Sequence, residues 1–286
     1  MEERNERGET LEEFLARYDE TQYRRPSNTV DMILLTVLKG KLKVLLVKRK
    51  DHPFIHDWAM PGGFVNFDED LDAAMKRELE EETNLFDSTY FRQLYTFGNA
   101  DRDPRTRVIT TVYLSMTPAE NIKMTSAGDD AMDTGWFTIQ KITMTTDGHE
   151  RKSILMLDEE EKGIHLRYEI YDTACDNYVQ TRSKLLDSSN AKLAADHIKA
   201  INMAIDVVRN RAASTGIMFN LLPKECTLRE IQEVYEAIVN HPVDTGNFRR
   251  DIKKMLVATG NTTIVNGRKV ATYSFNPLLP FVKETL

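Results

Sequence analysis

Apolar residues gather in short runs along the first two thirds of the chain, in a pattern typical of β-strands. Residues 30–38 form an apolar run of the kind expected for a buried strand, and a second strand is expected over 42–47 after a short turn. In residues 164–170 apolar positions alternate with charged ones, which is the period of a half-buried strand. Further strands are expected over 90–97, 108–116, from 135 and over 154–157. The pattern predicts a mixed sheet.

Helical spacing occurs in three places before residue 216. Near the N-terminus, Thr10 and Glu13 form a capping box in front of a short helical pattern. Residues 71–82 contain no Gly or Pro and are rich in strong helix formers. A polar break at 187–190 then precedes a third helix of about six turns, which ends near 214–216. Its apolar stripe consists of Leu193, His197, Ile201, Ile205 and Val208. On this stripe we interpret His197 as a packed core residue rather than a ligand.

The last part of the chain has a different order of elements. Thr227 and Glu230 form a second capping box, which opens a helix. A turn follows, and Phe248, Ile252, Met255 and Leu256 then mark another helix. Two strands, over 262–265 and 269–275, flank Asn266-Gly267, a strong hairpin signal. Helix, turn, helix and hairpin is the order of a winged helix.

Composition is that of an ordinary soluble protein. The 286 residues are 41% hydrophobic and 29% charged, with a net charge of −7. The two cysteines, Cys175 and Cys226, lack Cys-x-x-Cys spacing, which argues against a thiolate zinc site and favours a reduced cytoplasm. No apolar run is long enough to cross a bilayer, and no secretory signal opens the chain. We therefore expect a cytoplasmic protein without a membrane partner.

Acidic residues crowd one face of the helix expected over 71–82. Glu78, Glu81 and Glu82 are three or four residues apart, so their side chains project to the same side, with Cβ atoms about 5–6 Å apart. Carboxylates so close repel one another unless a cation lies among them, and oxygen ligands suit Mg²⁺ or Mn²⁺. Gly62 and Gly63, just before this helix, allow the backbone to approach a metal and phosphates closely.

Residues 58–85 resemble the Nudix box. From Gly63 the spacing runs through Glu69 to Arg77-Glu78-Leu79-Glu80-Glu81-Glu82, with Asn84 where the family has Gly. The resemblance implies an α+β fold, with a Nudix α/β/α sandwich built on a mixed sheet. It implies a metal site of Gly63, Glu69, Glu78, Glu81 and Glu82, with Arg77 orienting the glutamates by ion pairing. We therefore expect an N-terminal helical extension over 1–28, a Nudix domain over 29–187, a connecting helix over 188–216 and a winged-helix domain over 217–286.

Two further segments extend the resemblance. Residues 101–105 and the strand after them, together with Trp136-Phe137, are similar to the corresponding parts of ADP-ribose-type Nudix proteins. There Arg102 and Arg105 either bind the phosphate or ribose of a substrate or form a salt-bridged loop. Residues 219–223, leading into the winged helix, resemble the Nudix-related transcriptional regulators of NAD metabolism.

The winged-helix segment has a positive charge balance. From residue 220 onward nine Lys and Arg stand against seven acids, so this segment carries +2 and the remainder −9. A basic exposed helix face can enter the major groove while the wing contacts phosphate. The alternative is a winged helix that serves for dimerisation or as a lid, which the acidic first helix favours. The candidate DNA-binding residues are Arg249, Arg250, Lys253, Arg268 and Lys269.

Two functions follow from the resemblance. In the first, the chain is a Mg²⁺- or Mn²⁺-dependent pyrophosphohydrolase acting on a nucleotide sugar or dinucleotide such as ADP-ribose, with or without regulatory DNA binding. In the second, it is a transcriptional regulator that senses such a nucleotide and binds operator DNA. The complete set of glutamates favours retained hydrolysis. A homodimer is expected by analogy with both classes. Asp129, Asp130 and Asp133 are candidates for a general base by position only.

Overall fold

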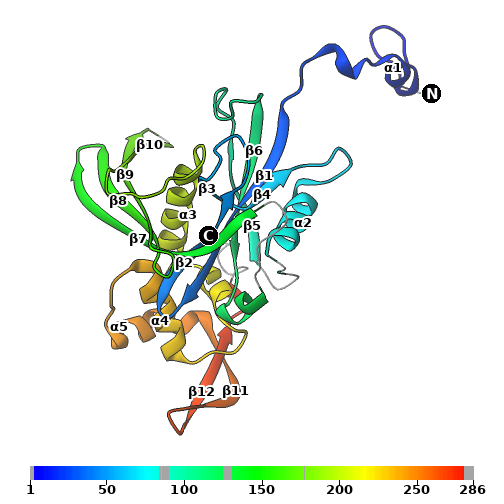
Figure 1. Ribbon diagram of the computed structural model, residues 1–286. Coiled ribbons are helices and arrows are strands. Elements are labelled where there is room, and N and C mark those ends of the chain that lie inside the picture. The colour runs from blue at the N-terminus through cyan, green and yellow to red at the C-terminus, as the bar shows by residue number, and fades with distance from the viewer. Residues whose placement is uncertain (1–2, 84, 86–89, 125–130, 177, 280–286) are drawn as a thin grey trace.

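The computed structural model describes residues 3–83, 85, 90–124, 131–176 and 178–279. Ten strands form one mixed sheet, in the order β10-β9-β8-β7-β2-β1-β6-β5, with β3 paired to β2 and β4 paired to β1 (Figure 1). The pair of β1 and β6 is parallel, and the other pairs are antiparallel. The strands are β1 (Ser27–Leu38), β2 (Lys41–Arg49), β3 (Trp58–Ala59), β4 (Gly62–Phe64), β5 (Tyr90–Phe97), β6 (Val108–Met116), β7 (Ala131–Asp147), β8 (Glu150–Glu159), β9 (Ile164–Cys175) and β10 (Tyr178–Leu185).

Strand β1 explains the layered architecture, because it is buried on both faces. Val30, Met32 and Leu34 pack against α2 (Leu71–Thr83) on one side of the sheet. Ile33 and Leu35 belong to a second cluster on the opposite side, which includes α3 (His197–Ala212). A strand covered on both faces has to be apolar at successive positions, not at alternate ones. The sheet between two helical layers confirms the predicted sandwich.

The sheet is larger than the sequence pattern indicated. Strand β7 begins before the apolar segment predicted from residue 135 and continues far beyond it, and β10 was not predicted. The second half of β7, from Ile142, is exposed, and most side chains of β10 are exposed too. Strands without a buried face leave no alternating apolar pattern, and pairing with β9 places β10 at the sheet edge.

Helix α3 begins later than predicted. We expected it to start near residues 188–190, with Leu193 on its first turn; instead, Leu193 forms a bridge with Trp58 and the helix starts at His197. Leu193 is therefore buried because it packs beside β3 and not because it belongs to the helix. At the N-terminus, α1 (Leu11–Arg17) has the predicted capping box, stands away from the rest of the molecule and buries no residue (Figure 1).

The C-terminal elements are those of a winged helix. They comprise α4 (Leu228–Val239), α5 (Thr245–Ile252), β11 (Leu256–Val265) and β12 (Arg268–Phe275). The capping box of Thr227 and Glu230 is present, and Asn266 and Gly267 form the hairpin turn, both with positive φ. The second helix is shorter than predicted: Lys253 and Met255 lie in a 3₁₀ turn, and Leu256 starts the wing. No helix within the described residues has the length and apolar character needed to cross a membrane.

Candidate nucleotide site and DNA-binding surface

The two glycines before α2, Gly62 and Gly63, lie where no side chain fits. Strand β4 pairs with β1 so that Gly63 lies opposite Val30 and Gly62 opposite Asp31. A Cβ atom on Gly62 would lie 2.2 Å from the carbonyl oxygen of Val30, and one on Gly63 would lie 2.1 Å from Oε1 of Glu78. The carboxylate of Glu78 therefore packs directly over the Gly63 backbone. This close approach explains the glycine requirement better than a turn does.

Arg77 connects three of the predicted metal ligands. Its guanidinium donates to both carboxylate oxygens of Glu69 at 2.9 and 3.0 Å, and to Glu78 at 2.7 Å. It also reaches Glu81 at 3.1 Å and the carbonyl of Phe64 at 3.1 Å. A guanidinium presents five donors in a planar fork, so one arginine can fix several carboxylates at once. These contacts are the ion pairing that the resemblance implied for Arg77.

The electrostatics of this cluster differ from one glutamate to the next. The hydrogen bond from Arg77 lowers the pKa of Glu69, whereas burial raises the pKa of Glu78 despite its contact with Arg77. The carboxylates in turn raise the pKa of Arg77. The guanidinium of Arg77 therefore stays charged and compensates part of the negative charge of the glutamates around it.

Tyr113 is a positioning residue that the sequence pattern did not reveal. It is fully buried on β6, donates to Asp72 in the first turn of α2 at 2.5 Å and accepts from Gln93 at 3.1 Å. Burial and the contact with Asp72 raise the pKa of Tyr113 to about 12. The phenol thereby ties the start of α2 to the sheet.

Tyr113→Phe should lower the free energy of unfolding by about 1 kcal/mol, the typical net contribution of one such hydrogen bond. Urea denaturation of the two proteins measures this difference. Because Asp72 is exposed, water can replace the lost donor, so the effect stays small. A loss above about 3 kcal/mol would contradict this role and indicate a packing defect.

A cavity of about 840 Å³ joins the Nudix box to the loop after β5. Gly62, Gly63, Arg77, Glu78, Glu81 and Glu82 line one part of it, and Arg102 and Arg105 line another. Arg105 pairs with Asp103 at 2.9 Å and lies over the ring of Phe64, while Arg102 pairs with Asp196 at 2.9 Å. Both arginines are thus salt-bridged, as one of the two interpretations held, and both also face the cavity.

His197 lines the same cavity but has a structural role. Its Nδ1 accepts the backbone N–H of Met60 at 2.9 Å, and burial lowers the pKa of the imidazole. The ring is therefore neutral and serves as an acceptor for the strand that leads into Gly62 and Gly63. This agrees with its interpretation as a packed residue rather than a ligand.

The donor chemistry of the cavity fits a hard divalent cation, although the side chains are arranged around Arg77. Within the described residues no group of three or more acidic, His or Cys side chains converges as a metal site. The carboxylates of Glu78, Glu81 and Glu82 nevertheless share one cavity with the Gly63 backbone, and these are the oxygen donors that Mg²⁺ and Mn²⁺ prefer. Of the general-base candidates, Asp129 and Asp130 lie outside the described residues, and Asp133 pairs with Lys162 away from the cavity lining.

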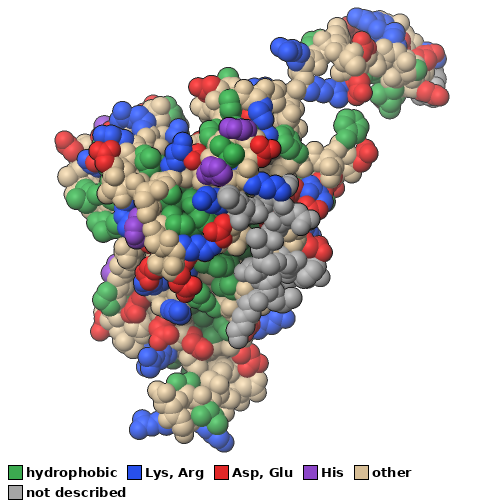
Figure 2. Space-filling model, in the orientation of Figure 1, with side chains coloured by type: hydrophobic (Ala, Val, Ile, Leu, Met, Phe, Trp, Pro, Cys, Tyr) green, Lys and Arg blue, Asp and Glu red, His purple; other side chains and the backbone are tan. Residues whose placement is uncertain are grey.

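The predicted DNA-binding residues lie on the exposed side of the winged helix. Arg249 and Arg250 are exposed on α5, Lys253 follows in the 3₁₀ turn, and Arg268 and Lys269 are exposed at the start of β12. Lys and Arg side chains gather at the free end of the β11–β12 hairpin (Figure 2). Arg250 also forms an exposed ion pair with Asp251 at 3.1 Å. The exposed face of α5 and the wing thus both present positively charged side chains to solvent.

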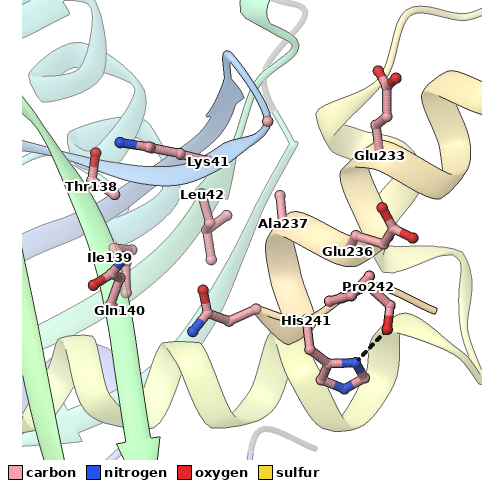
Figure 3. A pocket seen from close by; sticks show the side chains of 12 residues that line it. Lys41, Leu42, Thr138, Ile139, Gln140, Glu233, Glu236, Ala237, His241 and Pro242 are labelled. Carbon is pink, nitrogen blue, oxygen red and sulfur yellow. Dashed lines mark hydrogen bonds between the residues drawn. The ribbon is translucent and has the colours of Figure 1, made fainter.

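A second hollow of about 310 Å³ lies beside the contact between the winged helix and the sheet. Lys41 and Leu42 of β2 and Thr138, Ile139 and Gln140 of β7 line one side of it, and Glu233, Glu236 and Ala237 of α4 line the other (Figure 3). Lys41 itself pairs with Glu160 at 2.6 Å. The hollow lies at the seam of the two parts of the chain.

The glutamates of α2 lie over the glycines of β4 and face a cavity, in a sheet covered by helices on both sides. Together these features define a Nudix-type fold, which a winged helix follows here. Residues 26–157 match the family described as NUDIX domain, and residues 218–275 match the NrtR DNA-binding winged helix domain. The ADP-ribose pyrophosphatase of Methanocaldococcus jannaschii is 35% identical over 129 residues, which are 45% of this chain and 72% of that protein. The chain belongs to the Nudix family.

Similarity to known regulators covers most of the chain. The ADPR responsive transcriptional repressor NtrR of Acinetobacter baylyi is 28% identical over 266 residues, 92% of this chain and 87% of that protein. The crystal structure of Shewanella oneidensis NrtR complexed with a 27mer DNA superimposes with a TM-score of 0.57 at 26% identity, over 88% of this chain and 94% of that one. These matches confirm the predicted order of a Nudix domain and a winged helix.

Proposed function

We propose that this chain is a transcriptional regulator that binds ADP-ribose or a closely related nucleoside diphosphate in the Nudix cleft and DNA through its winged helix. The observation that carries the proposal is the presence of both surfaces in one chain, with a glycine-lined, arginine-rich cleft and an exposed basic helix and wing. The similarity of 92% of the chain to a repressor named for its response to ADPR supports it.

The cleft supplies the groups that a diphosphate needs. Guanidinium groups bind phosphate oxygens in pairs, so Arg102 and Arg105 are the candidates to hold the ligand. The glycine backbone lets the ligand approach closely, and Arg77 holds Glu69, Glu78 and Glu81 in place. With Gly63, Glu69, Glu78, Glu81 and Glu82 as its ligands, a bound Mg²⁺ or Mn²⁺ would neutralise phosphate charge and activate a water.

The winged helix supplies contacts of two kinds. In this proposal the exposed N-terminal residues of α5 and the side chain of Arg249 would reach base edges in the major groove. Lys253, Arg268 and Lys269 would contact phosphates, which fixes position without reading sequence. A homodimer would present two such units to a twofold operator, so the dimer remains part of the proposal.

Replacing both Arg268 and Lys269 by alanine should weaken binding to every DNA sequence and reduce the slope of log K against log salt by about 2, one for each lost phosphate contact. Fluorescence anisotropy at several salt concentrations measures the slope, with DNA from the protein's genomic neighbourhood as the probe. A matched control is the exposed pair Lys184 and Arg182 on β10, far from the winged helix, where the same change should leave the slope unaltered. An unchanged slope for the wing variant would exclude the wing from DNA contact.

A second candidate function is hydrolysis of the bound nucleotide. The specific observation that favours it is that Glu78, Glu81 and Glu82 line the cleft while Arg77 holds Glu69 beside them. Such a set of carboxylates fits the metal chemistry that Nudix hydrolases generally use. Glu82→Gln keeps the size of the side chain and removes its charge. We expect it to lower Mg²⁺-dependent turnover of ADP-ribose by at least about a hundredfold.

The assay follows phosphate-ester products from a panel of nucleoside diphosphate compounds. Glu80→Gln is the matched control, because Glu80 lies exposed on the same helix and does not line the cavity. Turnover by the wild type on none of the compounds would refute the hydrolase proposal while leaving the regulator proposal intact.

A further inference from the structure

Helix α3 has one end at the nucleotide cleft and the other at the winged helix. It runs from beside β3 toward α4 (Figure 1). Its apolar face forms a single continuous core with the sheet and the winged helix, from Ile198 and Ile205 to Ile231 and Ile238. A rigid element with a contact at each site can carry a change from one site to the other.

The first end of α3 is fixed to the strand that enters the Nudix box. Trp58 donates its backbone N–H to the carbonyl of Lys192 at 3.0 Å, and Ala194 donates to the carbonyl of Trp58 at 2.8 Å. Met60 donates to Nδ1 of His197 at 2.9 Å. The next residues along the chain are Pro61, Gly62 and Gly63. The start of α3 is therefore hydrogen-bonded to the segment that leads directly into the cavity lining at Gly62 and Gly63.

One side-chain contact at this end faces the cavity. Arg102 donates to both oxygens of Asp196, at 2.9 and 3.3 Å, and Asp196 is the residue immediately before α3. The two side chains are only 6% and 16% exposed. Asp31 lies 4.0 Å away, so Arg102 has a second, weaker anionic neighbour. A planar guanidinium that already binds a carboxylate in bidentate form is equally suited to a phosphate.

The other end of α3 holds the winged helix through one arginine. Arg209 donates through Nε to the carbonyl of Ile238 on α4 at 2.9 Å, and through Nη1 to the carbonyl of Lys141 on β7 at 3.2 Å. The hollow of about 310 Å³ at the seam is lined by the same two elements that Arg209 joins, α4 and β7 (Figure 3). Arg209 therefore ties α4 to β7 at a seam that is not completely filled by side chains.

We propose that the Arg102–Asp196 ion pair couples the two sites. This rests on the proposed function and names its regulation. The diphosphate of a bound nucleotide competes with Asp196 for the guanidinium of Arg102, which releases the start of α3. The shift reaches α4 through Arg209, so nucleotide binding weakens DNA binding, and DNA weakens nucleotide binding by the same factor. Arg102 thus contacts the ligand, and Asp196 is a positioning residue for the DNA-binding surface.

The test compares coupling in the full chain with and without the ion pair. Affinity for a DNA fragment from the genomic neighbourhood is measured by anisotropy, alone and with saturating ADP-ribose. We expect ADP-ribose to weaken DNA binding by at least about fivefold in the wild type. In Asp196→Asn the factor should fall below about two, although each ligand still binds on its own. A merely structural role for Asp196 would change the separate affinities and leave their ratio unaltered.

Two further variants sharpen the result. Asp158→Asn removes an Arg–Asp pair of equal carboxylate exposure, 16%, at 2.6 Å from Arg167 and away from α3, and should keep the wild-type factor. Arg209→Lys retains the charge but not the fork that bridges two carbonyls, and should lose the coupling from the other end. Wild-type coupling in Asp196→Asn would overturn the inference, and wild-type coupling in Arg209→Lys would overturn its transmission to α4 through Arg209. Failure of the wild type to bind ADP-ribose or DNA would instead refute the proposed function.

Discussion

Gly63→Ala should lower the affinity of the protein for Mn²⁺ by about 10–100-fold, the loss typical when a metal ligand is displaced from its orientation. The added methyl group would lie 2.1 Å from Oε1 and 2.5 Å from Cδ of Glu78. Contacts this short are excluded, so the carboxylate of Glu78 has to leave its position above the β4 backbone. Isothermal titration with Mn²⁺ measures the change without relying on turnover.

Gly98→Ala is the control for this substitution. Gly98 lies in the same domain, and a Cβ there would meet only Ile109 at 3.9 Å, an ordinary contact. This variant should bind Mn²⁺ as the wild type does. If Gly63→Ala also binds Mn²⁺ normally while remaining folded, Glu78 is not a ligand in the arrangement proposed for the cleft.

Asp172→Ala should lower the free energy of unfolding by about 3–5 kcal/mol, as expected when one partner of a buried ion pair is removed. Asp172 is only 4% exposed on β9, and accepts from Arg151 at 2.7 Å and Thr181 at 2.8 Å. Lys141 lies 3.7 Å away with 2% of its side chain exposed. Without Asp172, these two cations share the single carboxylate of Asp206 on α3.

Urea denaturation of wild type and variant measures this loss. Glu150→Ala is the control, because Glu150 lies on the neighbouring strand β8 and pairs with Arg182 at 2.9 Å, with 41% and 66% of the two side chains exposed. Such surface pairs contribute at most about 1 kcal/mol. Although burial opposes it, hydrogen bonds from Arg151 and Thr181 lower the pKa of Asp172. Its stabilisation is therefore present above about pH 4 and shrinks as pH falls further. Equal losses for the two variants would contradict a buried network.

The sequence predicted those parts of the fold that rest on local signals. The capping boxes at Thr10 and Thr227 and the Asn266-Gly267 turn depend on residues at most three positions apart, so they could be predicted directly. The apolar run of β1 predicted a buried strand, and the structure shows that both of its faces are covered. The start of α3 could not be predicted in this way. Leu193 fits the apolar spacing of the helix, but it packs beside Trp58, which is far away in the chain.

In the candidate site, too, the residues close together in the sequence could be predicted and those that act across the chain could not. The glutamates of α2 follow from helical spacing within one element, and Arg77 lies among them. Tyr113 and Asp196 could not be predicted, since each acts on a residue more than forty positions away, Asp72 and Arg102 respectively. Only the folded chain brings such pairs together. The roles of the metal ligands and the domain boundaries remain predictions.

The central claim is that a nucleotide in the Nudix cleft controls a DNA-binding winged helix in the same chain. Its most direct test is a titration of ADP-ribose into the complex of wild-type protein with DNA from its genomic neighbourhood, followed by anisotropy. The account predicts specific binding at least about a thousandfold tighter than to unrelated DNA, which saturating ADP-ribose weakens at least about fivefold. Equal affinity for all sequences, or specific binding that ADP-ribose leaves unchanged, would contradict it.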